Sequence, residues 1–353
     1  MKGPLYLFVL PAVLASGAAL ADPVADFYKG KQMTFIIRSN AGGGYDQYSR
    51  LLGRHIVKHV PGNPTMLFIN MPGGGGIQAA NFIAVQAPKD GTHLTMVSQG
   101  LPMDQALGLN KGLQADMKTF NWIGNMSDSN QVTVTWFTSP TKTIEDAMKR
   151  ETVIGATGAG SISTQIPAVL NNVVGTKFKV IFGYPGGSDI NLAMERGEVE
   201  GRATNPWASY VAVTPHFIAE KKINLLVQVG LRKDKDLPNV PLMRELAKDP
   251  EGQAILDYVS KATAVGRPVG TTPGVPKDRV EALRKAFDAT LEDPEFKMES
   301  DKQKMEISPM TGAELQQLIA DLIDAPKELL EKVRQVTTSR DAKEMPGAKP
   351  SAN

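Results

Sequence analysis

The stretch that decides the fold runs from Met33 to His59 and reads MTFIIRSNAGGGYDQYSRLLGRHIVKH. Its apolar run at 35–37 predicts a buried strand, and apolar residues recur at helical spacing from Tyr45 onward. Glycines at 42–44 separate the strand from the helix. Such a turn leaves backbone N–H groups uncovered beside a helix N-terminus, so this corner of a sheet can bind an anion.

The spacing of these glycines does not fit the common phosphate-binding motifs. The stretch lacks the Gly-x-x-x-x-Gly-Lys-Ser/Thr pattern of a P-loop, and its glycines are consecutive where a dinucleotide fingerprint needs G-x-G-x-x-G. A glycine turn before a helix is also common for architectural reasons. An architectural turn and an anion site therefore both remain open for this stretch alone.

The N-terminal segment 1–21 predicts a signal peptide. Lys2 precedes an uncharged apolar stretch, and Ala19-Leu20-Ala21 matches a small-residue cleavage site, so we expect export to the periplasm with cleavage after Ala21. A membrane anchor is the alternative for this segment. No later stretch approaches the roughly 18 apolar residues of a membrane span.

The composition excludes several classes of function. The chain carries 39 Lys and Arg against 37 Asp and Glu, which leaves no net charge of the kind that attracts nucleic acid, so no nucleic-acid partner is expected. It has 0 cysteines, so neither disulfides nor thiol chemistry is available. No cofactor is expected.

Further stretches repeat the pattern of a strand followed by a glycine-rich turn. A strand at 65–70 leads into Gly73–Gly76, a strand at 152–156 leads into Thr157–Ser161, and a strand at 180–184 leads into Pro185-Gly186-Gly187. The alternation of strands with helices predicts an α/β fold. Turns of this kind that face one another on two lobes would form a clamp for a ligand.

Catalytic and metal motifs are weak. His55 and His59 are four residues apart on one helix, but Ile56 stands where a zinc protease has its glutamate, so no metal site is expected. The segment Gly158–Ser163 has the wrong order for a G-x-S-x-G nucleophile elbow. We therefore expect a binding protein and not an enzyme, with an exported hydrolase as the weaker alternative.

Several long motifs together resemble one family, the extracytoplasmic solute receptors of tripartite tricarboxylate transporters, or Bug-type receptors. The resemblance covers essentially the whole chain after the signal peptide. It rests on FYKGK at 27–31, AGGGYDQYSRLLGRHI at 41–56, NMPGGGG at 70–76, APKDGT at 87–92, GTKFKVIFGYPGGSDINLAMERGEVEGR at 175–202, LPNVPL at 237–242 and PGVPKDRVEALRKAFDATLEDPEF at 273–296.

The resemblance implies a two-lobed periplasmic-binding-protein fold of type II character. Each lobe is expected to hold a mainly parallel sheet flanked by helices, and two crossing strands form the hinge. The expected division is 22–124 plus 236–340 for lobe I, 125–235 for lobe II and 341–353 for a mobile tail. The implied function is capture of a small organic carboxylate between the lobes and its delivery to the membrane subunits of a transporter. We expect a monomer, and presentation to a membrane sensor is the alternative.

The candidate ligand-binding residues lie on the glycine turns and beside them. We expect the carboxylate to be held chiefly by backbone N–H groups and hydroxyls, with at most one arginine, Arg38 or Arg202. Asp189 is interpreted equally as a helix cap or a ligand contact, and Trp207 as core or cleft wall. The predicted set is Ser39, Asn40, Gly42, Gly43, Gly44, Tyr45, Asp46, Thr157, Gly158, Gly160, Ser161, Ser163, Tyr184, Gly187, Asp189 and Trp207.

Overall fold

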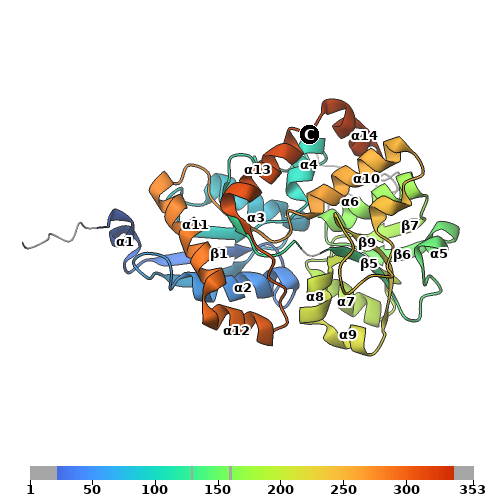
Figure 1. The fold of residues 1–353 in the computed structure, drawn as a ribbon, viewed down its shortest axis with the longest axis horizontal. Coiled ribbons are helices and arrows are strands. Elements are labelled where there is room, and N and C mark those ends of the chain that lie inside the picture. Colours follow the sequence, from blue (N-terminus) through green and yellow to red (C-terminus); the bar gives the residue numbers. More distant parts are fainter. Residues whose placement is uncertain (1–21, 129, 159–160, 338–353) are drawn as a thin grey trace, which may run out of the picture.

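The computed structural model describes residues 22–128, 130–158 and 161–337, and these form two sheets flanked by helices (Figure 1). The predicted signal peptide 1–21, the predicted tail 341–353 and the candidate Gly160 lie outside the described residues. No helix in the described ranges is both long and apolar enough to cross a membrane.

The first sheet has the strand order β11-β4-β10-β3-β1-β2. The central strand β1 runs parallel to β2 and β3, whereas β10 runs antiparallel to both β3 and β4, and β11 runs antiparallel to β4. Its strands are β1 (Gln32–Ile37), β2 (Thr65–Asn70), β3 (His93–Met96), β4 (Asn121–Asn125), β10 (Pro268–Thr271) and β11 (Met310–Thr311).

The second sheet has the order β7-β6-β8-β5-β9. Here β6 is parallel to β7 and β8, and β5 is antiparallel to β8 and β9. Its strands are β5 (Gln131–Trp136), β6 (Thr152–Gly155), β7 (Phe178–Ile181), β8 (Gly201–Pro206) and β9 (Ile223–Val229).

Both sheets are therefore mixed, although the sequence predicts mainly parallel ones. Parallel pairing is found where a helical crossover joins consecutive strands, as from β1 to β2 and from β6 to β7. The antiparallel strands β10 and β5 are those that arrive from the other sheet, so their direction is set by the crossing of the chain and not by a local crossover.

Helices cover both faces of each sheet. Those beside the first sheet are α1 (Pro23–Tyr28), α2 (Gly44–Ile56), α3 (Ile77–Asn81), α4 (Leu101–Leu107), α11 (Lys277–Glu292), α12 (Pro294–Lys302) and α13 (Gly312–Ile323). Those beside the second are α5 (Ile144–Lys149), α6 (Ile162–Val169), α7 (Gly187–Glu195), α8 (Trp207–Val213) and α9 (Pro215–Ala219). The helices α3 and α6 each continue into one π-helical turn, over Phe82–Gln86 and Leu170–Val174.

Strand β1 shows how the core is built from the sequence. Phe35 and Ile37 point to the α2 and α11 side of the sheet, and Ile36 points to the opposite side with α3 and α4, because successive side chains of a strand alternate between faces. All three side chains are fully buried. The continuous apolar run of the sequence therefore matches a strand that is covered on both faces.

The chain crosses between the sheets twice, between β4 and β5 and between β9 and β10. The two crossings touch, since the N–H of Arg267 donates to the carbonyl of Ser127 at 3.0 Å and the N–H of Met126 donates to the carbonyl of Arg267 at 3.2 Å. This backbone pairing joins the two lobes and forms the hinge.

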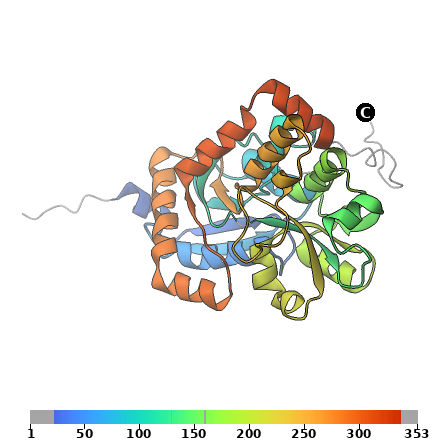
Figure 2. The same cartoon turned by 45° about the vertical axis from the view of Figure 1, so that its right-hand side comes forward.

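Two helices contact elements of both lobes. α10 (Pro250–Thr263) and α14 (Lys327–Thr337) pack against α4 beside the first sheet and against α6 beside the second, where they lie above the second sheet (Figure 1, Figure 2). One hydrophobic cluster runs through all four helices. The predicted boundary between the lobes at 235/236 stays a prediction, because these later helices belong to neither lobe alone.

The carboxyl group of Asp104 in α4 gives a prediction about stability. Its side chain is 1 % exposed, and Oδ1 accepts a hydrogen bond from Asn110 Nδ2 at 2.5 Å. Burial raises the pKa of Asp104 to about 6, although the hydrogen bonds from Asn110 and Gln165 act in the opposite direction. The folded protein therefore favours the protonated carboxyl, so this group lowers the free energy of unfolding as the pH rises from about 4 to about 6.

We expect Asp104→Asn to be more stable than the wild type at pH 8 and to lose this advantage near pH 4. The gap above pH 6 should be on the order of 3 kcal/mol, measured by urea unfolding at both pH values. Asp301→Asn, at an exposed position, serves as the control and should follow the wild type. An equal gap between Asp104→Asn and the wild type at pH 4 and pH 8 would contradict this account of Asp104.

Candidate functional site

A cavity lies between the two lobes at the carboxyl ends of β1, β3 and β8. Its free volume is about 50 Å3, room for a few water molecules, and the glycine contacts between the lobes described below show that the lobes are closed on each other. Its walls come from both lobes and from the hinge. The lining residues are Arg38, Ser39, Gly43, Gly44, Tyr45, Ser98, Gln99, Gln131, Thr157, Ser161, Ile162, Ser163, Gly186, Gly187, Arg202, Thr204, Asn205, Pro206 and Arg267.

The turn after β1 supplies the first wall. Gly43 is the N-cap of α2 and Tyr45 lies in its first turn. Two guanidinium groups lie against the Tyr45 ring, whose centre is 4.5 Å from Cζ of Arg38 and 4.3 Å from Cζ of Arg267. The Tyr45 hydroxyl accepts a hydrogen bond from the N–H of Gln99 at 3.2 Å. The first helix turn therefore positions a tyrosine that holds two arginines at the cavity.

Asp46 stabilises this turn from behind. Its Oδ2 accepts from the N–H of Gly42 at 3.0 Å, and its Oδ1 accepts from Arg50 Nε at 2.8 Å and from Asn70 Nδ2 at 2.9 Å. Asn70 also donates to the carbonyl of Ser39 at 2.7 Å. The carboxylate is thus occupied by the protein itself, which explains why Asp46 does not line the cavity.

A group of hydroxyls forms the second wall. Ser161 is the N-cap of α6, and its Oγ accepts from the N–H of Ser163 at 3.3 Å. Ser163 Oγ lies 2.9 Å from Ser161 Oγ and accepts from the N–H of Thr157 at 3.1 Å. These side chains hold one another at the start of α6, where hydroxyls and the helix N-terminus favour an anion.

The third wall joins the turn before α7 to β8. Gly186 is the N-cap of α7, and a Cβ at Gly187 would collide with the guanidinium of Arg202. Arg202 donates from Nη1 to Asn191 Oδ1 at 2.9 Å and from Nη2 to Asn205 Oδ1 at 2.7 Å. The glycine leaves the space in which two asparagines fix the arginine.

The lobes meet through glycine backbones at one edge of the cavity. A Cβ at Gly158 would lie 2.5 Å from the backbone nitrogen of Gly75, and a Cβ at Gly75 would lie 2.7 Å from the backbone nitrogen of Ser161. Gly75 follows β2 of the first sheet and Gly158 follows β6 of the second. Side chains at these positions would keep the lobes apart.

Ten of the candidate residues named from the sequence line this cavity. They are Arg38, Ser39, Gly43, Gly44, Tyr45, Thr157, Ser161, Ser163, Gly187 and Arg202.

The structure places other candidates away from the cavity. Trp207 is buried in the core of the second lobe near Tyr210, with ring centres 6.4 Å apart. Tyr184 and Gly158 line a neighbouring groove with Phe182. The candidates that do not line the cavity are Asn40, Gly42, Asp46, Gly158, Tyr184, Asp189 and Trp207. A role of any candidate in ligand binding stays a prediction.

Other lining residues are missing from the sequence-based set. Ser98 and Gln99 follow β3 as Arg38 follows β1, and the parallel pairing of the two strands brings both ends to one edge of the sheet, so their position could have been inferred. Arg267 reaches the cavity only through the hinge, for which the sequence offers no local signal. The residues missed are Ser98, Gln99, Gln131, Ile162, Gly186, Thr204, Asn205, Pro206 and Arg267.

The cavity is built for negative charge. Three of the described lining residues are arginines, and none of the described lining residues is an aspartate or glutamate. Nε of Arg38, Nε of Arg202 and Oγ1 of Thr204 are buried without a hydrogen-bond partner within the described structure. The expectation that at most one arginine holds the ligand stays a prediction.

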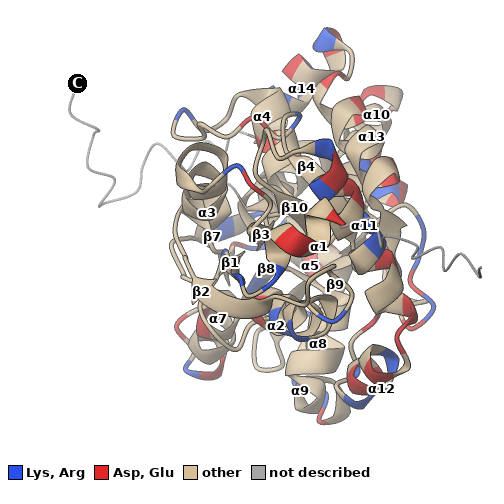
Figure 3. Cartoon of the chain, turned by 90° about the vertical axis from the view of Figure 1, so that its left-hand side faces the viewer, with Lys and Arg blue, Asp and Glu red and all other residues tan. Residues whose placement is uncertain are grey.

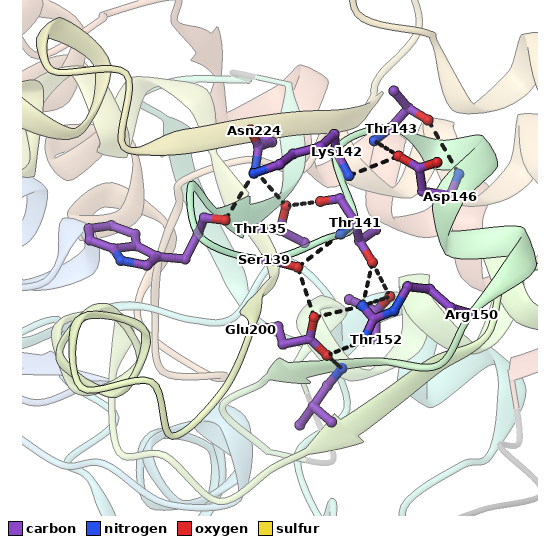
Figure 4. Close-up of polar contacts among 12 residues, drawn as sticks. Thr135, Ser139, Thr141, Lys142, Thr143, Asp146, Arg150, Thr152, Glu200 and Asn224 are labelled. Carbon is purple, nitrogen blue, oxygen red and sulfur yellow. Dashed lines mark hydrogen bonds and ion pairs between the residues drawn. The ribbon is translucent and has the colours of Figure 1, made fainter.

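A second dense polar network, none of whose labelled residues lines the cavity, is linked by hydrogen bonds between its own side chains (Figure 4). Glu200 Oε2 accepts from Arg150 Nη1 at 2.7 Å and from Ser139 Oγ at 2.8 Å, and Thr141 Oγ1 lies 2.7 Å from Thr152 Oγ1. Because its groups bond to each other, this network serves to hold β5, β6 and α5 together and offers little to a ligand.

His55 lies in the last turn of α2 and His59 in the turn that follows it, so the two histidines do not share one helix as the sequence predicts, and both have structural partners. His55 Nε2 lies 2.7 Å from Glu299 Oε2, and His59 Nε2 lies 3.0 Å from Asp293 Oδ2, so both histidines join α2 to the α12 region. The described ranges contain no group of three or more His, Cys, Asp and Glu side chains that could hold a metal ion. Acidic and basic residues are interspersed along α11 and α12 (Figure 3).

A fold of two α/β lobes with a cleft at the strand ends and a hinge of two crossings defines a periplasmic-binding-protein class. The model of the tripartite tricarboxylate transporter family receptor, TctC, matches residues 57–334, well over half of the chain. The chain belongs to this receptor family, as the sequence motifs predict.

Individual relatives agree with this assignment. The chain is 26% identical over 329 residues to the UPF0065 protein in the gbd 5' region of Cupriavidus necator, covering 91% of this chain and 93% of that protein. Among solved structures, the periplasmic binding protein BugD has a TM-score of 0.70 at 20% identity, with 88% of this chain and 99% of BugD covered. MatC from Rhodopseudomonas palustris, solved with bound malate, has a TM-score of 0.68 at 19% identity, with 87% and 99% covered. The two-lobed fold predicted from the sequence is confirmed.

The glycine contact between the lobes gives a prediction about closure. The backbone of Gly158 has no positive φ, so Gly158→Ala should fit within its own lobe, yet its methyl group would collide with Gly75 when the lobes close. We expect this variant to keep the wild-type melting temperature in the ligand-free state and to bind a carboxylate ligand at least about tenfold more weakly by calorimetry.

Gly112→Ala is the matched control, because a Cβ there meets no atom within 4 Å and the backbone also has no positive φ. It should bind like the wild type. Unchanged affinity in Gly158→Ala would mean that ligand binding does not need the lobes to close to this contact.

Proposed function

We propose that the protein captures a small organic carboxylate in the cleft between its lobes and delivers it to the membrane subunits of a tripartite tricarboxylate-type transporter. The observation that carries this proposal is a cavity between the closed lobes in which three arginines, several hydroxyls and helix N-termini converge without a lining acid among the described residues. A carboxylate supplies the acceptors that these donors lack.

Relatives support the chemical class of the ligand. MatC was solved with malate, and the Rhodopseudomonas protein Rpa4515, with a TM-score of 0.67 at 17% identity and with 86% of this chain and 97% of that chain covered, was solved with adipate. Both ligands are dicarboxylates of a few carbon atoms. The same class suits this cavity, which must widen as the lobes part to admit such a molecule.

The proposal is for a receptor without catalytic activity. Family and fold are those of binding proteins. The described lining residues include no histidine or acid that could act as a general base, and the cavity hydroxyls of Ser161 and Ser163 bond to each other. Export to the periplasm, cleavage after Ala21 and action as a monomer complete the proposed function.

A thermal-shift screen of the mature protein with mono-, di- and tricarboxylates tests the ligand class. A ligand at 100 times its Kd should stabilise the folded state by about 2.7 kcal/mol and raise the melting temperature accordingly. If no carboxylate raises the melting temperature at millimolar concentration, the proposed ligand class is wrong.

The variant Arg202→Gln tests whether this cavity is the ligand-binding site. The ligand in this test is the carboxylate that raises the melting temperature of the wild type most in the screen. Glutamine can still bond to Asn191 or Asn205 but carries no charge, so we expect a loss of about tenfold to a hundredfold in affinity by calorimetry, the equivalent of a hydrogen bond to a charged group. Arg150→Gln is the matched control, an arginine of the same lobe whose partner is Glu200. It should lower the melting temperature slightly and leave affinity unchanged. Equal affinity in both variants would place the ligand elsewhere.

Delivery needs a separate test in cells. Deleting the gene should abolish uptake of the acid identified in the screen, and the wild-type gene should restore it. Normal uptake in the deletion strain, together with a lost transcriptional response to the acid, would support presentation to a membrane sensor instead.

A further inference from the structure

Three guanidinium groups meet at the cavity from three separate parts of the fold. Arg38 follows β1 of the first sheet, Arg202 lies in β8 of the second, and Arg267 lies in the crossing segment just before β10. Their exposed fractions are 5 %, 8 % and 3 %. Arg38 and Arg267 both contact the Tyr45 ring of the first lobe, so closing the lobes brings the charge of Arg202 to this pair and opening would remove it.

No carboxylate of the described chain neutralises these groups. None of the three arginines has an Asp or Glu oxygen within 4 Å in the described ranges, where their hydrogen-bond partners are neutral. Arg38 donates from Nη2 to the carbonyl of Gly75 at 2.7 Å, and Arg267 donates to Ser209 Oγ. A guanidinium keeps its charge under physiological conditions, so the closed protein holds three buried positive charges.

The electrostatics of the cluster are unfavourable when the lobes are closed. Burial lowers the pKa of Arg38 and the pKa of Arg202, and the positive charge of Arg267 lowers both further, while Tyr45 and Tyr210 act in the opposite direction. The tyrosine rings contribute roughly 0.5–2 kcal/mol each through cation–π contact, which is less than the several kcal/mol that a buried unpaired ion costs. The rings alone do not compensate the cluster.

We propose that Arg38, Arg202 and Arg267 act as a charge gate, in which the cost of burying their unpaired charges together, increased by their mutual repulsion, holds the ligand-free lobes apart and a ligand with two or more negative charges closes them. A monoanion leaves two uncompensated positive charges in the closed cavity, whereas a dianion leaves one. The free energy of closure therefore depends on the charge of the ligand as well as on its shape. The ligand half of this proposal rests on the proposed function, and the ligand-free half does not.

The ligand-free half is tested by measuring the distance between the lobes. The chain has 0 cysteines, so Met298→Cys and Leu192→Cys can carry a pair of spin labels. These positions are 67 % and 43 % exposed, on α12 of the first lobe and α7 of the second. We expect a long distance in the labelled wild type without ligand, and an increase of about tenfold or more in the closed-to-open ratio in labelled Arg267→Gln.

Two further variants separate charge from structure. Arg267→Lys keeps the charge and should give the wild-type distance distribution. Arg196→Gln removes an exposed charge of α7's C-terminal end, outside the cavity, and should also leave the distribution unchanged. A wild type that is closed without ligand, or an Arg267→Gln variant that stays as open as the wild type, would overturn the charge gate.

The ligand half uses malate and adipate against their monoamides, which match them in length but carry one negative charge. The dianions should shorten the distance in the wild type and the monoamides should not, and Arg267→Gln should weaken this discrimination by about tenfold or more. Equal closure by acid and monoamide would overturn the role of charge. If neither the two acids nor their monoamides shorten the distance between the spin labels, the proposed closure by dianions is wrong for this class of ligand. The measurement without ligand tests whether the arginine charges hold the lobes apart, and it does not depend on the proposed function.

Discussion

The closed structure depends on backbone meeting backbone where Gly75 of the first lobe faces Gly158 of the second. At this distance no side chain can intervene, so the lobes meet there through peptide groups alone. The glycines of the turns at 73–76 and 157–158 are therefore needed for the approach of two bodies as well as for local turn geometry. This constraint also explains why so small a cavity can bring together groups from both lobes and the hinge.

The polar groups of the second lobe show two different uses of charge. In the network of Arg150 and Glu200, the guanidinium donates to a carboxylate that also accepts from the N–H of Val153, and these bonds join neighbouring segments of the second lobe. At the cavity, Arg202 is held by two asparagines but keeps Nε without a partner, and no acid balances it within the described structure. The candidate site differs from this network because some of its donors lack acceptors and its positive charges lack a neighbouring acid within the described structure. The number of polar residues does not distinguish the two.

Much of the fold could be predicted because its signals are local. The apolar run of β1, the glycines before α2 and the helical spacing after Tyr45 are all read from consecutive residues, and the family motifs extend this to the whole chain. About half of the cavity lining could be predicted in the same way, from turns that follow strands. The rest depends on long-range geometry. Arg267 arrives through a crossing segment, and the direction of β5 and β10 follows from the path between the lobes. Trp207 shows the converse, because a residue just past a strand end can equally pack inward.

The cluster shared by α4, α6, α10 and α14 has a mechanical consequence. Two bodies that share a packed side cannot separate there without breaking apolar contacts, so the least costly rotation has its axis near that side. The gap then widens on the opposite side, where α2 contacts α8 (Figure 1). Opening would therefore rotate the lobes about an axis near the C-terminal helices. The cleft would widen at the start of α2, beside the turn where Tyr45 contacts Arg38 and Arg267.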